Sequence, residues 1–149
     1  MTDFHPFVVH FPIALLLTAA GFDLFSAIRP NFQSNKTGYI LQILGALGAI
    51  IAAFSGNLAE TAVRNQEQLS SAVNESLSTH VSYGNAMVWI IVILVLFRSF
   101  ALLEKKEWAS KGWLFPALAV LVAILVVVTG FLGGNLSHDI LQYFINSSQ

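Results

Sequence analysis

Four long apolar stretches constrain the fold of this chain more than any other feature of its sequence. A helix needs about 20 predominantly apolar residues to cross the hydrocarbon core of a bilayer, which is about 30 Å thick. The chain contains four stretches of about that length with very few ionisable residues. The sequence therefore predicts four transmembrane helices, over residues of about 7–28, 39–57, 83–103 and 113–136.

The composition leaves little of the chain for anything other than these helices. Of the 149 residues, 56% are hydrophobic and only 10% are charged, whereas a soluble domain carries about 25% charged residues. We therefore expect one domain over residues 1–149. Its expected fold is that of an all-α integral membrane protein, an antiparallel four-helix transmembrane bundle.

Charge and cysteine content exclude several classes of function. Seven Lys and Arg residues against eight Asp and Glu residues give a formal net charge of −1, so no basic field is available to bind a nucleic acid. The absence of cysteine excludes disulfides, thiolate metal sites and cysteine-ligated iron–sulfur clusters. The sequence lacks GxSxG, HExxH and phosphate-binding glycine motifs. It predicts no catalytic residue and favours a non-enzymatic role.

The basic residues predict the orientation of the bundle. Six of the seven lie in connections, or near a helix end, on one side of the membrane, which the positive-inside rule assigns to the cytoplasm. Both termini and the connection over residues 58–80 are then predicted to face outwards. That connection is polar but rich in helix formers, so we expect helical extensions of the second and third spans that meet at Ser70-Ser71 or Asn74. The six basic residues are Arg29, Lys36, Arg98, Lys105, Lys106 and Lys111.

All four histidines lie at the predicted outer ends of the helices. His10 stands inside the apolar run VVHFPIALLL, and a polar group in hydrocarbon is unfavourable unless paired, so its side chain is expected to face the bundle interior. His5 comes five residues earlier, about 140° around a regular helix. Both rings would face one centre only if Pro6 and Pro12 interrupt the helix. Asp3–Phe11 would then be an irregular segment, or lip, at the outer surface, and the regular helix would begin at Pro12.

Other polar residues fall at the same level as these histidines. His80 opens the third span and His138 follows the fourth. Glu60 closes the second span and is either a solvated residue or the partner that fixes the tautomer of a histidine. His5 and His138 are either ligands or simple hydrogen-bond donors at the headgroup level. Near the inner end of the first span, Asp23 is expected to form a structural ion pair with Arg29 or Arg98.

The opening segment HPFVVHFPI, residues 5–13, resembles the HPxxVHFPI signature of a bacterial membrane family catalogued as domain of unknown function 2231. This resemblance implies a bacterial cytoplasmic (inner) membrane location and a respiratory or redox setting. The orientation predicted from the basic residues then places the termini and histidines on the periplasmic side. The chain departs from the family pattern near residue 140, where the family often has a histidine and this tail has only His138. Further segments that resemble the family are Ser55-Gly56 with Glu60, His80 with Asn85, and LGGNL at residues 132–136.

The sequence favours a small membrane subunit that binds a b-type haem or transfers electrons. In this interpretation His10 and His80, on neighbouring helices, ligate the haem iron, because imidazoles on facing helices of a bundle suit it. Ser55, Asn57 and Asn85 are the expected supporting residues.

Two alternatives remain open. One is a protein that binds or handles a divalent metal, Zn or Cu, through nitrogen and oxygen ligands. The other is a cofactor-free structural subunit of a respiratory or photosynthetic complex. The expected partners are the lipid bilayer, redox partner proteins or a larger membrane complex, and a second copy of the chain, for which small-residue strips leave room. The metal ligands of the first alternative would be His5, His10, His80, Glu60 and His138.

Overall fold

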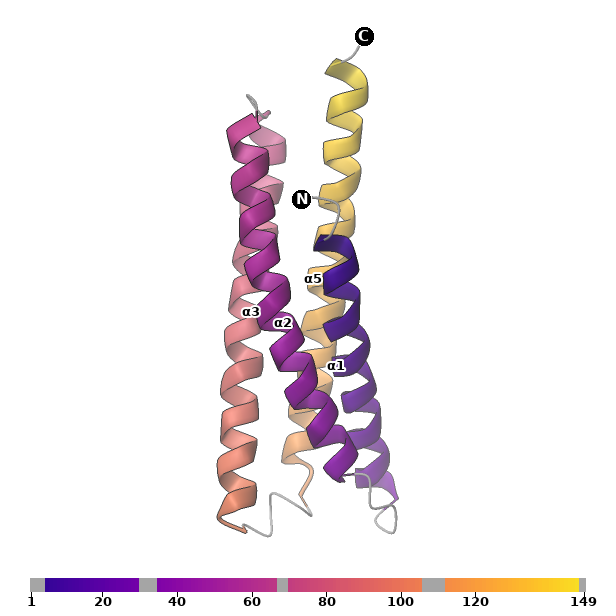
Figure 1. The fold of residues 1–149 in the computed structure, drawn as a ribbon. Coiled ribbons are helices and arrows are strands. Elements are labelled where there is room, and N and C mark those ends of the chain that lie inside the picture. Colours follow the sequence, from indigo (N-terminus) through magenta and orange to yellow (C-terminus); the bar gives the residue numbers. More distant parts are fainter. Residues whose placement is uncertain (1–4, 30–34, 67–69, 106–111, 148–149) are drawn as a thin grey trace.

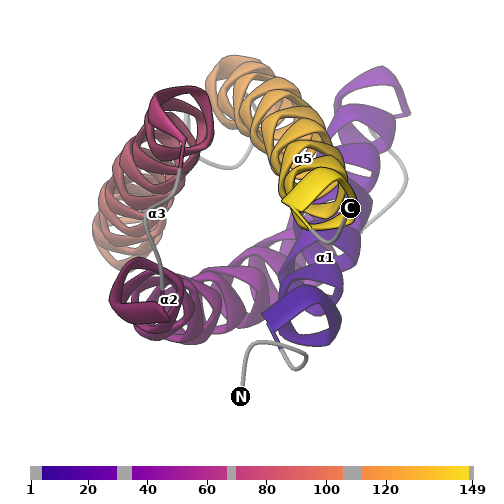
Figure 2. The same cartoon turned by 90° about the horizontal axis from the view of Figure 1, so that it is seen from above.

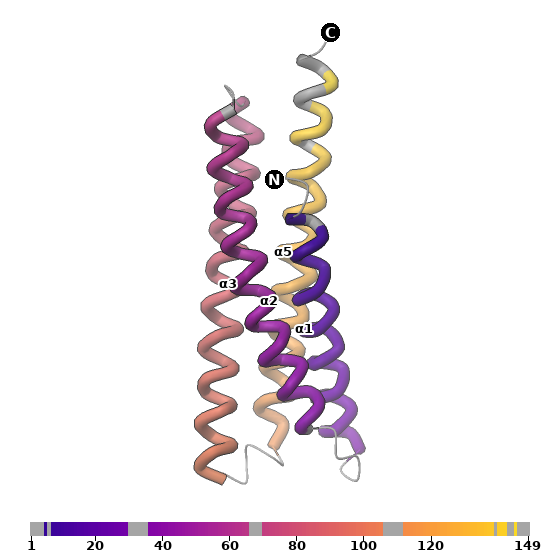
Figure 3. Tube along the Cα trace, viewed as in Figure 1, coloured from indigo at the N-terminus to yellow at the C-terminus, as the bar shows by residue number. Residues whose placement is uncertain are grey.

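The computed structural model describes residues 5–29, 35–66, 70–105 and 112–147. These residues form four long α-helices joined by short connections, and no strand occurs among them. The helices run alternately up and down, so that α1 begins and α5 ends at the same end of the bundle (Figures 1 and 3). All four are long and apolar enough to cross a membrane. The expected all-α, antiparallel four-helix membrane bundle is confirmed. Its helices are α1 (His5–Ile28), α2 (Asn35–Gln66), α3 (Ser71–Leu103) and α5 (Leu114–Ser147).

The helices extend well beyond the apolar stretches predicted from the sequence. Helix α2 continues to Gln66 and α3 begins at Ser71, so the expected helical extensions of the second and third spans are confirmed. Ser70 is the N-cap of α3, because its hydroxyl accepts a hydrogen bond from the Val73 amide at 3.3 Å. Residues 67–69 lie outside the described part of the chain. Helix α5 extends to Ser147, about three turns past the predicted end.

Seen along its axis, the bundle is a ring in which α1, α2, α3 and α5 follow one another and α5 returns to α1 (Figure 2). Helices α1 and α3 therefore stand at opposite corners. The closest packing is between α1 and α2, where Gly45 lies against the Leu16 side chain and Gly48 lies against Pro12. Small residues permit such close approach between helices in a membrane.

The core is narrow and the outer surface is apolar. Large side chains such as Trp89, Ile93, Val127 and Phe131 are exposed around the bundle. Exposed apolar side chains on all sides are typical of a bundle that contacts lipid instead of water. The central core residues are Leu16, Ala46, Ala49, Ile91, Val122 and Val126.

One cluster of buried polar residues lies toward the end of the bundle where α1 ends. The guanidinium of Arg98, on α3, donates from Nη1 to Asp23 Oδ2 at 2.5 Å and from Nη2 to Asp23 Oδ1 at 2.8 Å. Nη1 also donates to Gln42 Oε1 on α2 at 2.9 Å. Asp23 is 1% exposed and Arg98 is 3% exposed. The expected ion pair of Asp23 is thus confirmed, with Arg98 as its partner.

Neighbouring residues enclose this ion pair. The Arg98 Cζ atom lies 5.5 Å from the centre of the Tyr39 ring and 5.3 Å from the centre of the Phe115 ring, within the range of cation–π contacts. A Cβ atom at Gly38 would collide with Asp23 Oδ1, so glycine is needed there for the carboxylate to fit against α2. Through Asp23, Gly38, Arg98 and Phe115 the cluster touches all four helices.

We expect the substitution Asp23→Asn to destabilise the bundle strongly. It would leave the Arg98 charge buried without an opposite charge, and breaking a buried ion pair from one side costs about 3–5 kcal/mol. Thermal unfolding of the purified protein in mild detergent measures the loss. The double variant Asp23→Leu/Arg98→Met, which removes both charges, should unfold at a higher temperature than Asp23→Asn.

Glu60→Gln is the matched control, because it breaks the Arg64–Glu60 pair on the surface of α2. Surface pairs contribute at most about 1 kcal/mol, so this variant should unfold close to the wild-type temperature. An Asp23→Asn variant as stable as Glu60→Gln would contradict the structural role of the buried pair.

Candidate functional site

His5, in the first turn of α1, is held in one tautomer by α2. Its Nδ1 atom lies 2.8 Å from Ser55 Oγ. The Ser55 hydroxyl donates its own proton to the Ala52 carbonyl at 2.8 Å, so it accepts from His5 Nδ1–H. The proton of the neutral ring is therefore on Nδ1, and the lone pair is on Nε2. A histidine whose Nδ1–H is held by a hydrogen bond presents Nε2 as a ligand or proton acceptor.

The His5 ring packs directly on a glycine of α2. A Cβ atom at Gly56 would lie 2.9 Å from His5 Cε1, which is closer than carbon atoms approach each other. Ser55 and Gly56 therefore form one unit, in which the serine orients the imidazole and the glycine leaves room for it.

His80 makes the same kind of contact with a glycine on the other side of the bundle. Its ring, on α3, packs on Gly133 of α5, where a Cβ atom would lie 2.9 Å from His80 Cε1. The His80 Nδ1 atom is buried and has no hydrogen-bond partner in the part of the chain that the structure describes. An unpartnered buried nitrogen is unfavourable, and such groups often mark a binding site.

His5 and His80 form the candidate site. Both are half-buried, on helices α1 and α3, which stand at opposite corners of the ring. Each ring is packed on a glycine of the neighbouring helix. We call this group the histidine layer; it contains one residue from each helix, namely His5, Gly56, His80 and Gly133.

The histidine layer is in helical register with the buried ion-pair cluster at the other end. On every helix the member of one layer is 18 residues from the member of the other, which is five turns and a rise of about 27 Å. Residues five full turns apart lie on the same face of a helix. The same faces of the four helices therefore build both layers, at a separation close to the thickness of a membrane core, about 30 Å. We call the second group the arginine layer; its members are Asp23, Gly38, Arg98 and Phe115.

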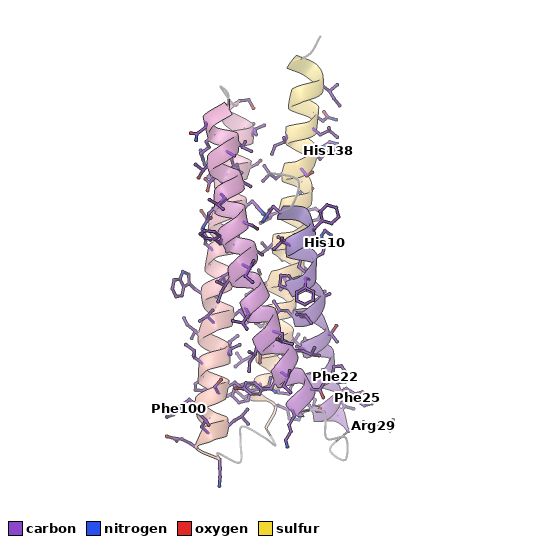
Figure 4. All side chains as sticks on the ribbon, in the orientation of Figure 1. His10, Phe22, Phe25, Arg29, Phe100 and His138 are labelled. Atoms are coloured by element: carbon purple, nitrogen blue, oxygen red, sulfur yellow. The ribbon has the colours of Figure 1, made fainter. Side chains whose placement is uncertain are left out.

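The structure corrects the expectation for His10. Helix α1 is continuous from His5 and includes Pro12, so no irregular lip precedes it in the described residues. Because five residues turn a regular helix by about 140°, His10 points away from the face that carries His5. Its side chain is exposed (Figure 4). The expectation that His10 faces the bundle interior was wrong, and His5 is the histidine of α1 that faces inwards.

His138 is also exposed, on the part of α5 beyond Gly133 (Figure 4). It follows Gly133 by five residues, and the same rotation of about 140° turns it away from His80. Glu60 is paired with Arg64 at 2.9 Å, and Arg64 Nη1 also donates to Asn74 Oδ1 at 3.0 Å.

The five residues expected to bind a metal are therefore not gathered. Among the described residues, no three or more His, Asp or Glu side chains are placed to hold a metal ion together. The tautomer partner of His5 is Ser55, whereas Glu60 was the residue considered for such a role.

The expected supporting residues separate into two groups. Ser55 binds His5 directly, whereas Asn85 Nδ2 approaches Asn57 Oδ1 at 3.4 Å on the exposed side of α2 and α3. The sequence does not indicate that Gly56 and Gly133 lie against histidine rings. The pairs Ser55-Gly56 and Gly133-Gly134 were visible as motifs, but which glycine meets a ring depends on the rotation of each helix.

The chain matches a known protein family over most of its length. Residues 2–141 match the family described as "Predicted membrane protein (DUF2231)". The chain belongs to this family. No curated protein and no solved structure matches the chain.

We expect Gly133→Ala to displace the His80 ring. The new methyl group would lie 2.9 Å from His80 Cε1, so the imidazole must rotate away. The chemical shift of the His80 ring protons, observed by NMR in detergent micelles, should change. Gly134→Ala is the control, because a Cβ atom at Gly134 meets nothing within 4 Å. An unchanged His80 signal in Gly133→Ala would contradict the packing described.

We also expect His5 to make the bundle less stable in acid. Burial lowers the pKa of His5 below its ordinary value of 6.5. The unfolded chain then takes up a proton at His5 near pH 6.5, whereas the folded chain takes it up only at lower pH, so stability is lost as the pH falls below 6.5. The fall in unfolding temperature between about pH 7.5 and pH 5.5 should be smaller in His5→Gln than in the wild type. An equal fall in both proteins would contradict this role of His5.

Proposed function

We propose that this protein is a small membrane subunit that holds a b-type haem through His5 and His80 and transfers electrons at that end of the bundle. One observation carries the proposal. Two half-buried imidazoles on opposite helices each share a helix face with one member of the Asp23–Arg98 pair, and Ser55 fixes the tautomer of one imidazole. Paired imidazoles on facing helices of a bundle suit haem iron.

The residues of the histidine layer fit the donor requirements of haem. A haem iron would take up to two protein ligands, and His5 and His80 would supply two nitrogen donors. The lone pair of His5 is on Nε2, because Nδ1–H is held by Ser55. His80 Nδ1 has no partner in the described residues, so a ligand there would replace no hydrogen bond of that atom.

Each residue has a defined part in this proposal. His5 and His80 bind, and Ser55 orients His5 and raises its basicity through the Nδ1–H hydrogen bond. Gly56 and Gly133 let the rings lie close to the backbone of α2 and α5. When bound, the haem supplies one-electron transfer. His5 is in the first turn of α1 in the described residues, and we place the approach of a redox partner protein at this end of the bundle.

The same residues are a less suitable ligand set for a Zn or Cu ion than for haem iron. Zn takes three or four protein ligands, whereas the described residues bring only two histidines together here. His10 and His138 are exposed and turned away, and Glu60 is paired with Arg64. We therefore prefer haem to a divalent metal ion.

Absorption spectroscopy of the purified protein tests the proposal. Wild-type protein produced with an ample haem supply should show a Soret band and sharp α and β bands on reduction. His5→Ala and His80→Ala should each lose most of the bound haem, and added imidazole should restore part of it because it replaces the missing ligand.

His10→Ala and His138→Ala are the matched controls and should keep the full haem content. A wild-type protein that stays colourless after haem is supplied would overturn the proposal, and would favour a cofactor-free structural subunit. Loss of haem from His10→Ala but not from His5→Ala would contradict the ligand assignment.

A further inference from the structure

A shallow groove runs along the outer face of α1. It has a volume of about 460 Å³ and is lined by Thr18, Gly21, Phe22 and Phe25. A Cβ atom at Gly21 would meet nothing within 4 Å, so the absence of a side chain there leaves the groove open. The Thr18 hydroxyl donates to the Ala14 carbonyl at 2.7 Å and therefore presents mainly its methyl group. The groove is apolar and faces the membrane.

A cation stands at the end of this groove. The Arg29 amide donates to the Phe25 carbonyl at 2.9 Å, which continues the helical turn past Ile28. Arg29 follows Phe25 by four residues, so both lie on one side of α1, as Figure 4 shows for Phe22, Phe25 and Arg29. Arg29 is exposed, and no carboxylate in the described residues pairs with it.

The groove and the cation together match an amphiphilic anion. Helix α1 ends at Ile28, so Arg29 is at the level where the hydrocarbon core gives way to the headgroups. An acyl chain fits the apolar groove, and a phosphate fits the guanidinium, which binds phosphate oxygens in a planar fork. A second copy of the chain is a poorer occupant. A twofold pairing through this face would bring two Arg29 side chains to the same membrane boundary, where like charges repel.

We propose that this face of α1 binds one anionic phospholipid, with its phosphate on Arg29 and one acyl chain along Thr18, Gly21, Phe22 and Phe25. The site lies toward the opposite end of α1 from His5 and does not depend on the proposed haem. The bound lipid would contact α1 close to the arginine layer.

Native mass spectrometry of the purified full chain in mild detergent tests this site. The probes are phosphatidylglycerol and phosphatidylcholine with identical acyl chains, and the number of lipids retained is counted. One basic side chain near the surface contributes about 1 kcal/mol, so phosphatidylglycerol should bind about fivefold more tightly than phosphatidylcholine. Arg29→Gln should abolish this preference. Gly21→Leu, which fills the groove, should reduce the binding of both lipids.

Two controls separate the site from general lipid contact. Lys36→Gln removes another exposed cation from the same end of the bundle and should keep the preference. Ala123→Leu fills a smaller groove of about 280 Å³ on α5 and should leave binding unchanged. A preference that survives in Arg29→Gln would overturn the proposal. So would a Gly21→Leu variant that changes the oligomeric state while its lipid binding stays the same, which would point to a second copy on this face.

Discussion

The ion pair between Asp23 and Arg98 sets how the helices of this bundle are rotated against one another. A carboxylate and a guanidinium inside an apolar bundle are strongly unfavourable unless they meet with good geometry. The two groups make two hydrogen bonds to each other, and Gln42 adds a third contact to the guanidinium. Contacts between apolar side chains tolerate small rotations of a helix, whereas the hydrogen bonds of this ion pair would be broken by them. Helices α1 and α3 must therefore turn these two residues inwards, although they stand at opposite corners of the ring.

The rotation fixed by this pair also determines what meets at the other end of the bundle. His5 precedes Asp23 by 18 residues and His80 precedes Arg98 by 18 residues, so each histidine shares the inward face of its helix with one member of the pair. The glycines of α2 and the Phe115–Gly133 pair of α5 keep the same spacing. A structural ion pair toward one end of the bundle and two inward-turned imidazoles toward the other are thus products of one helical register. This links the stability of the bundle to the proposed haem site.

The sequence was sufficient to predict the fold but not the rotation of the first helix. Long apolar stretches predicted four helices, and a lone Asp23 inside the first predicted an ion pair, because both inferences need only local composition. His10 was favoured over His5 because it stands deeper in the apolar run. The sequence leaves open whether Pro12 interrupts the first helix; α1 continues through it, and Pro12 packs against Gly48 of α2. The contacts of Gly56 and Gly133 depend on pairs of helices, so no single segment could reveal them.

Cysteine cross-linking in native membranes tests most directly whether His5 and His80 face each other. The chain contains no cysteine, so introduced pairs react without background. A short bifunctional maleimide should join the two introduced cysteines of the double variant His5→Cys/His80→Cys within one chain. It should not join those of His10→Cys/His80→Cys, because His10 points outwards. Cross-linking of the second pair but not the first would contradict the helical register on which the account depends.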